Sequence, residues 1–143
     1  MAVWEVHWRG EADGWRKNPT VAWLQGPEKE GAEKAFWAIW EVGDKWLRGE
    51  EIYCSIIAVH PGHQKRGIGQ LLIDWGLDVG EKLQVPVYLE STRAGLVFYT
   101  KLGFEKLSRG AVVKAEVTHV ASDFELPVTV KMPSAARRMG FEG

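Results

Sequence analysis

The clearest pattern along the chain is an apolar, strand-like run that gives way to helical spacing across a loop. Ile56–Val59 is a continuous apolar run of strand length, and the turn-forming pair Pro61-Gly62 ends it. After the loop, apolar residues recur at intervals typical of a helix with one buried face. These residues are Ile68, Leu71, Leu72, Trp75 and Val79. The pattern predicts a strand, a tight turn, a loop and a helix in succession.

The loop in this unit, Gln64 to Gly69, combines glycine with positive charge. Glycine allows a backbone to lie close to a bulky ligand, and the free N–H groups at a helix start bind anions. Lys65 and Arg66 add positive charge at the same place. Together these features indicate a site for a pyrophosphate group.

Two common nucleotide-binding motifs do not fit this loop. A Walker A loop requires Lys and a hydroxyl residue directly after its second glycine, whereas Ile68 and Gly69 follow Gly67 here. A dinucleotide-binding fingerprint requires a third glycine where this chain has Leu72. The alternative without a ligand is an ordinary strand–loop–helix connection whose glycines serve packing.

A second informative segment lies further along the chain. Val85–Glu90 has the composition of a strand, and Ser91 or Thr92 can cap a short helix predicted from about Ala94 to Leu102. Gly103 is predicted to end that helix in a left-handed conformation, which glycine adopts without steric cost.

Two motifs in this order resemble the GNAT superfamily of acyl-CoA N-acyltransferases. Gln64–Gly69 follows the strand end Val59-His60-Pro61 and fits the superfamily's coenzyme A loop, Gln/Arg-x-x-Gly-x-Gly/Ala. The segment Phe98–Phe104, FYTKLGF, looks like its "L-Y-x-K-x-G-F" signature. The resemblance covers Glu51 to the C-terminus. It implies an α/β fold with a mixed sheet, in which two parallel central strands splay apart and hold the pantetheine arm between them.

The resemblance also implies acetyl-CoA as co-substrate. Backbone groups at the end of the first splayed strand would bind pantetheine, and the loop amides would bind the pyrophosphate. The residues expected to contact the coenzyme are Ile57, Ala58, Val59, Gln64, Lys65, Arg66, Gly67, Ile68, Gly69, Gln70, Thr92 and Tyr99. Thr92 stands where many members carry Asn, and Gly95 where they carry Ala. No metal is expected, because the four histidines and one cysteine lack ligand spacing.

The reaction that the resemblance implies is direct attack of a primary amine on the acetyl thioester. Tyr99 matches the superfamily's proposed acid, because a phenol near pKa 10 keeps its proton at neutral pH and can protonate the departing thiolate. A main-chain N–H at about Val59 would polarise the carbonyl. Glu51 is the first candidate for the base that takes the proton of the amine, and Glu90 is the second.

The rest of the sequence is consistent with a single domain. Residues 1–143 are expected to form one domain, with a divergent Trp-rich segment over 1–50 and a coenzyme-binding core over 51–132. The other expected elements are a strand over Met1–Trp8, a short strand over Thr20–Leu24, a helix over Glu30–Leu47, an antiparallel hairpin of Ala111–Val120 with Pro127–Met132, and a frayed tail over Ser134–Gly143.

The Trp-rich segment stands where the superfamily has a strand and two helices over the acceptor site. Either that cover is missing here, or this segment replaces it. Seven of the eight tryptophans precede the coenzyme loop. One interpretation places them in the core, and a second has some of them line an acceptor pocket or the face of a homodimer.

The net charge and the cysteine content limit which binding partners and which cellular compartment we expect. A formal net charge of -1 argues against nonspecific nucleic-acid binding. The single Cys54 excludes an internal disulfide and fits a reducing compartment, so the cytosol or nucleus is expected. Because Cys54 lies in an apolar strand, we expect a packed and inert thiol. The sequence has no apolar run long enough to cross a bilayer, so no membrane partner is expected.

Three functional hypotheses follow. The first is an active N-acetyltransferase that uses acetyl-CoA and a small-molecule or protein amine. The second is a non-catalytic acyl-CoA-binding module, and the third is an interaction domain whose tryptophans contact a partner. The sequence does not choose the acceptor, because one coenzyme scaffold serves many acceptors.

Overall fold

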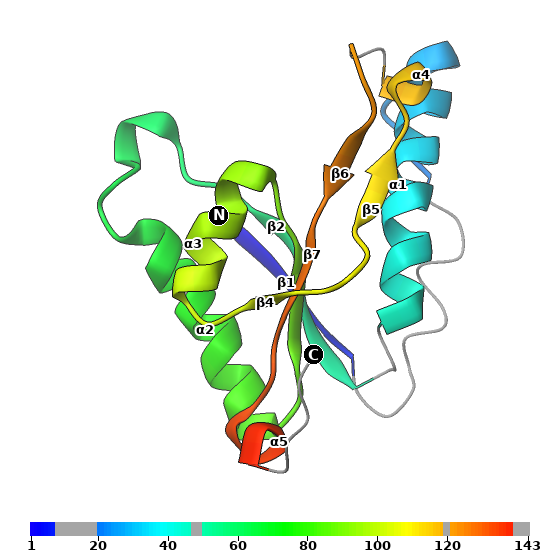
Figure 1. Ribbon diagram of the computed structural model, residues 1–143. Coiled ribbons are helices and arrows are strands. Elements are labelled where there is room, and N and C mark those ends of the chain that lie inside the picture. The colour runs from blue at the N-terminus through cyan, green and yellow to red at the C-terminus, as the bar shows by residue number, and fades with distance from the viewer. Residues whose placement is uncertain (8–19, 47–49, 119–120, 139–143) are drawn as a thin grey trace.

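The computed structural model describes residues 1–7, 20–46, 50–118 and 121–138. Its centre is a five-stranded sheet with the strand order β1-β2-β3-β7-β4 (Figure 1). Beside it, two further strands form a small antiparallel sheet. The strands are β1 (Ala2–His7), β2 (Glu51–Ile57), β3 (Val87–Glu90), β4 (Glu105–Lys106), β5 (Ala111–Val113), β6 (Phe124–Leu126) and β7 (Val128–Lys131).

Helices lie on both sides of the main sheet, as Figure 1 shows. Helices α2 (Ile68–Leu83) and α3 (Arg93–Lys101) lie on one side. Helix α1 (Gly26–Trp46) lies on the other side, next to β5 and the short helix α4 (Ala115–Thr118). No helix in the described part of the chain is long and apolar enough to cross a membrane. The fold is the mixed α/β arrangement that the sequence predicted.

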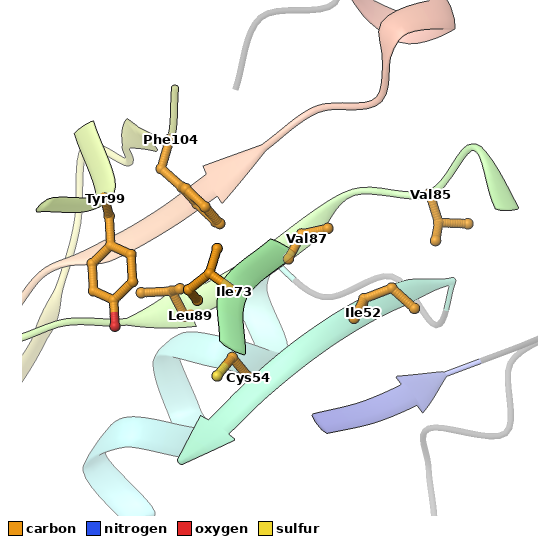
Figure 2. Packing of buried hydrophobic residues seen from close by; sticks show 8 residues of the cluster. All are labelled: Ile52, Cys54, Ile73, Val85, Val87, Leu89, Tyr99 and Phe104. Atoms are coloured by element: carbon orange, nitrogen blue, oxygen red, sulfur yellow. The ribbon is translucent and has the colours of Figure 1, made fainter. Parts of the chain in front are cut away.

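The two faces of the sheet carry separate apolar clusters, because successive strand residues point to opposite sides. The cluster on the side of α2 and α3, shown in Figure 2, contains Ile52, Cys54, Ile73, Val85, Val87, Leu89, Tyr99 and Phe104. The opposite face carries Leu107, Val128 and Val130, and Val42 of α1 packs against them. Trp4 of β1 belongs to the first face, where its ring lies 6.0 Å from that of Trp75 of α2.

The predicted parallel arrangement of the two central strands is confirmed. Strands β2 and β3 are parallel and pair at Ile52↔Val87 and Tyr53↔Tyr88. Helix α2 connects them, and helix α3 follows β3, as the apolar spacing predicted. The Thr92 hydroxyl caps α3 by accepting a hydrogen bond of 3.0 Å from the Gly95 N–H. The left-handed ending at Gly103 is also confirmed, with φ at 82°.

The N-terminal elements differ from the prediction in two places. Thr20–Leu24 is not a strand but contains a turn, in which the Leu24 N–H donates to the Val21 carbonyl at 3.2 Å. Helix α1 begins at Gly26-Pro27, four residues before the predicted start at Glu30. The fixed φ of proline suits the first turn of a helix, where its missing N–H costs nothing. Trp8 and Leu47, the predicted ends of two elements, lie outside the described residues.

The C-terminal hairpin also differs in its partners. The predicted strand Ala111–Val120 ends at Val113, and the short helix α4 follows. Asp123 fixes this change of direction, because its carboxylate accepts hydrogen bonds from the Ala115 N–H at 2.8 Å and from Lys114 Nζ at 2.7 Å. The partner of β5 is therefore β6, while β7 joins the main sheet.

Pro127 separates β6 from β7, and its carbonyl accepts a hydrogen bond of 2.8 Å from the Ser91 N–H. The tail predicted to be frayed contains helix α5 (Ser134–Arg138). The N–H and hydroxyl of Ser134 both donate to the carboxylate of Glu81 at the end of α2, which holds α5 in place.

Candidate functional site

The two central strands part where the site was predicted. The parallel pairing of β2 with β3 stops at Tyr53↔Tyr88, and the last residues of β3 pair only with β7. From that point the strands form the two sides of a wedge. Alternation turns Cys54 and Leu89 toward α3, and it turns Tyr53 and Glu90 toward α1.

On the α3 side of the wedge, Tyr99 packs among apolar residues. Its ring lies in the cluster with Leu89 and Cys54 (Figure 2), and its ring centroid lies 5.7 Å from that of Phe104 in an edge-to-face arrangement. Burial raises the pKa of Tyr99 to about 12, and the neighbouring Cys54 adds to the rise. The phenol therefore stays protonated at neutral pH and can only donate a proton there.

Cys54 lies beside Tyr99 and is also buried. Burial, with smaller contributions from the negative charges of Glu90 and Glu5, raises the pKa of its thiol to about 12. The thiolate is the nucleophilic form of cysteine, so this thiol is not activated for attack. The prediction of a packed thiol agrees with this setting.

On the α1 side of the wedge, the structure contains a cavity of about 340 Å³. Helix α1 closes one wall, and the ends of β2 and β3 form the other. The residues that line it are Glu5, Phe36, Ile39, Trp40, Tyr53, Ser55, Ile56, Glu90, Ser91, Thr92 and Leu126. Helix α1 of the Trp-rich segment thus contributes Phe36, Ile39 and Trp40 to the lining of this cavity.

The two candidate bases lie in different places. Glu90 lines the cavity, and one of its carboxylate oxygens accepts a hydrogen bond of 2.6 Å from the Tyr53 hydroxyl. Glu51 opens β2 at the other end of that strand, 1% exposed and opposite His7 of β1. Ile57 lies six positions further along the extended strand than Glu51, a distance of about 20 Å. Glu51 does not line the cavity, whereas Glu90 does.

The predicted coenzyme loop has a defined shape. A short 3₁₀ helix, η2 (Pro61–His63), follows the strand, and His60 Nδ1 accepts a hydrogen bond of 3.1 Å from the Gly62 N–H. The Gln64 side-chain amide donates to the Val59 carbonyl at 3.1 Å, which ties the loop back to the strand end. Arg66 lies 3.1 Å from His63 Nδ1.

The loop ends at the N-terminus of α2 in a conformation that glycine favours. Gly67 has φ at 79°, and a β-carbon at this position would meet no protein atom within 4 Å. No side chain caps α2 here, so the N–H groups of its first turn have no side-chain partner, and the exposed residues Lys65 and Arg66 directly precede them. Gly69 and Ile68 occupy the first turn. This arrangement of free N–H groups and positive side chains suits a pyrophosphate.

The three strand-end residues predicted to bind pantetheine differ in the direction of their backbone groups. The Ala58 N–H donates to the Met1 carbonyl at 2.9 Å, and its carbonyl accepts from the Met1 amino group at 2.8 Å. The backbone of Ala58 thus faces β1, and its N–H is not available for the role predicted from the resemblance. Because bonding directions alternate along a strand, Ile57 and Val59 face the wedge instead.

Two other predicted contact residues have structural partners. The Gln70 side-chain amide donates to the Asp74 carboxylate at 2.5 Å, one turn further along α2. Thr92 caps α3 through its hydroxyl and also lines the cavity. Trp40 is one of the seven N-terminal tryptophans, some of which were expected to line a pocket, and it lines this cavity, whereas sequence reasoning missed Glu5 and Phe36. The alternation of β1 placed Glu5 opposite Trp4, and this was the only signal for it.

Comparison with known proteins supports one family. The model of the acetyltransferase (GNAT) domain matches residues 27–106. A protein of Ajellomyces capsulatus named "Probable acyltransferase SID5" is 86% identical over 144 residues, with 100% of both chains covered.

Two solved structures are also similar. The ribosomal-protein-S18-alanine N-acetyltransferase of Escherichia coli has 28% identity and a TM-score of 0.46, over 59% of this chain and 55% of that one. Ard1 of Thermoplasma volcanium has 20% identity and a TM-score of 0.46, over 58% of this chain and 55% of that one. The matched part thus spans just over half of each solved chain.

Proposed function

Since this chain belongs to the GNAT superfamily of acyltransferases, we propose that it transfers an acetyl group from acetyl-CoA to a primary amine by direct attack. The observation that supports this most strongly is the arrangement around the wedge. Tyr99 lies on one face of the sheet, and the cavity with Glu90 opens on the other. The two faces thus offer separate places for a proton donor and for an acceptor.

The loop and the start of α2 are the proposed binding site for the coenzyme. Free N–H groups at the helix N-terminus, with Lys65 and Arg66 beside them, would hold the pyrophosphate. Ile57 and Val59 present backbone groups to the wedge, where they would bind the pantetheine arm. Within the described part of the chain, no hydrogen bond engages the Val59 N–H, which leaves it able to polarise the acyl carbonyl.

The proposed acetyl transfer is a balanced reaction that releases one proton. Acetyl-CoA supplies an activated acyl carbon and a thiolate leaving group. The amine nitrogen forms a bond to the acyl carbon while the carbon–sulfur bond breaks and its electron pair goes to sulfur. Tyr99 donates its proton to that sulfur and regains one after product release. The products are the amide, free CoA and the proton that the ammonium form of the acceptor gives up.

Glu90 is the residue that we propose to take this proton. An alkyl amine is mostly protonated at pH 7, so a base is needed to generate the attacking lone pair. Glu90 lines the cavity at the end of β3, whereas Glu51 lies about 20 Å along β2 from the strand end that forms the wedge. The geometry therefore favours the second sequence candidate over the first.

An assay of thiol release from acetyl-CoA in the presence of primary amines tests the proposal. We expect thiol release that depends on the amine, with a product heavier than the amine by one acetyl group. Alcohols of the same carbon skeleton serve as matched controls and should give none. Direct attack also predicts that the protein stays unlabelled when it is incubated with radiolabelled acetyl-CoA alone. Thiol release that no amine accelerates would refute the proposed activity.

A further inference from the structure

The cavity on the α1 side of the wedge contains a phenol that the proposed reaction does not use, that of Tyr53 in β2. Tyr53 is only 6% exposed and lines the cavity beside Glu90. Its hydroxyl donates a hydrogen bond of 2.6 Å to a carboxylate oxygen of Glu90. This length lies in the range of O–H···O⁻ bonds, which are stronger than hydrogen bonds between neutral groups. The ionised carboxylate is also the form of Glu90 that can take a proton from an amine.

The register of the sheet explains why this hydrogen bond crosses the wedge. Tyr53 pairs with Tyr88 at the last step of the β2–β3 ladder, and Glu90 lies two positions beyond Tyr88. Because strand side chains alternate, Tyr88 and Glu90 point to the same face of the sheet. The backbone of Glu90 pairs with Val128 of β7, on the other side of β3. The Tyr53 side chain therefore links Glu90 to β2 beyond the point where the two backbones have parted.

The other groups around Glu90 act against its negative charge. Glu5 of β1 lies in register with Tyr53, lines the same cavity and is 3.5 Å from His7. The Cys54 thiol lies close enough that the charge of Glu90 contributes to its raised pKa. Helix α1 and β6 contribute apolar groups to the cavity, namely Phe36, Ile39, Trp40 and Leu126. Apolar surroundings and a second carboxylate favour a protonated carboxyl group, whereas a donated hydrogen bond favours the ionised form.

We propose that Tyr53 is a positioning residue for acetyl transfer, whose hydroxyl keeps the base Glu90 ionised and directs its carboxylate into the cavity. This inference rests on the proposed N-acetyltransferase function. It also gives the two phenols at the wedge different tasks. The hydroxyl hydrogen of Tyr53 is donated to Glu90, whereas Tyr99, the proposed proton donor to the thiolate, lies on the opposite face of the sheet.

The pH profile of kcat/KM for the amine tests this proposal in the variant Tyr53→Phe, which keeps the buried ring and removes only the hydroxyl. The acid limb of such a profile reports the ionisation of the base in the free enzyme. Loss of a donor to the carboxylate favours its protonated form, so the acid limb should move to higher pH. We expect a shift of roughly 1 to 2 pH units, the value of one hydrogen bond to a charged group. An acid limb at the wild-type pH would overturn the inference.

The matched control is Tyr88→Phe, which removes a hydroxyl from the residue opposite Tyr53 in the ladder. Tyr88 packs against a different cluster and is not among the described residues that line the cavity; that cluster contains Leu107, Val128 and Val130. The control should leave the acid limb at the wild-type pH. Equal shifts in the two variants would show a general effect of hydroxyl loss on the sheet, against a specific effect of Tyr53.

A double-mutant cycle separates positioning of the base from support of the fold. Tyr53→Phe alone should lower kcat by roughly 10- to 100-fold and leave KM for acetyl-CoA unchanged. If Tyr53 acts through Glu90, the same substitution should lower kcat much less in the Glu90→Gln background, where no base remains to be positioned. The same fold-loss in both backgrounds would overturn the inference, because Tyr53 would then act independently of Glu90.

The ionisation of Glu90 gives a readout that needs no turnover. Protein labelled with ¹³C-glutamate is titrated by carboxyl NMR, and Glu90→Gln assigns the signal. Tyr53→Phe should move the midpoint of Glu90 to higher pH, and Tyr88→Phe should leave it in place. If amines are acetylated but the midpoint does not move, the inference fails while the proposed activity stands. If the midpoint moves but no amine is acetylated, the proposed activity fails while the effect of Tyr53 on the charge of Glu90 is supported.

Discussion

Tyr53 donates a hydrogen bond of 2.6 Å to the carboxylate of Glu90 across the two strands that part at the wedge. This contact holds a carboxylate at the mouth of the cavity, on the face opposite Tyr99. The position of this carboxylate is the reason that we propose Glu90, and not Glu51, as the base.

We predict that Glu90→Gln lowers kcat/KM by about 10²- to 10⁴-fold at pH 7, the usual contribution of a positioned base. The defect should shrink as the pH approaches about 10, because an alkyl amine then loses its proton to water. Rates across this pH range test the prediction. Glu51→Gln should leave kcat/KM for the amine nearly unchanged under conditions in which the protein stays folded. A large defect in Glu51→Gln that narrows with pH, with Glu90→Gln unaffected, would reverse the assignment.

Tyr99→Phe should lower kcat by about 10²- to 10⁴-fold and leave the affinity for acetyl-CoA unchanged. The substitution removes only the hydroxyl, so the ring keeps its packing against Phe104. Because burial raises the pKa of Tyr99 to about 12, the wild-type rate should not fall through loss of this proton below about pH 10. Single-turnover kinetics and calorimetry provide the two readouts. A variant with full kcat would show that Tyr99 is only a packed ring.

Cys54 should be unreactive in the folded protein. Burial raises the pKa of its thiol to about 12, so almost none of the reactive thiolate exists at pH 8. A thiol reagent such as dithionitrobenzoate should modify the native protein very slowly at that pH and react with one thiol after unfolding. Cys54→Ala should keep its turnover. Rapid labelling of the native protein with loss of activity would point to a nucleophilic cysteine.

Much of the structure after residue 51 could be predicted, because the residues that determine each turn and helix end lie close together in the sequence. Gly103 adopts the left-handed conformation that its place at a helix end suggested, and Thr92 caps α3. The acceptor half was not predictable in the same way. Glu5, Phe36 and Glu90 come from three separate elements, and only tertiary packing brings them to one cavity.

The errors in element assignment have the same origin. The segment after Val113 looked like a continuing strand, but the Asp123 carboxylate, eight residues beyond Ala115, bonds its backbone and starts a helix. Glu51 was placed by the sequence at the start of the strand whose other end, at Ile57, was expected to bind the coenzyme. The length of that strand, about 20 Å, is what separates Glu51 from the wedge.

The approach of α2 to β1 gives a stability prediction. A β-carbon at Gly76 would overlap the indole of Trp4, which is packed between the sheet and α2. Gly76→Ala should therefore reduce the free energy of unfolding by about 1–3 kcal/mol, the usual cost of overpacking. Gly69→Ala is the control in the same helix, because its β-carbon would lie at an ordinary 3.6 Å from Phe98. Urea denaturation that shows no difference between the two variants would contradict this packing.

The central claim is that the loop before α2 binds the pyrophosphate of acetyl-CoA, and calorimetric titration of acetyl-CoA tests it most directly. Gly67→Asp places a side chain and a negative charge in that site. Gly26→Asp is the matched control, because Gly26 also has a positive φ and open space around its β-carbon position but lies at the start of α1. We predict micromolar binding by the wild type and by Gly26→Asp, and none by Gly67→Asp. Equal binding by all three proteins, or none by the wild type, would contradict the account.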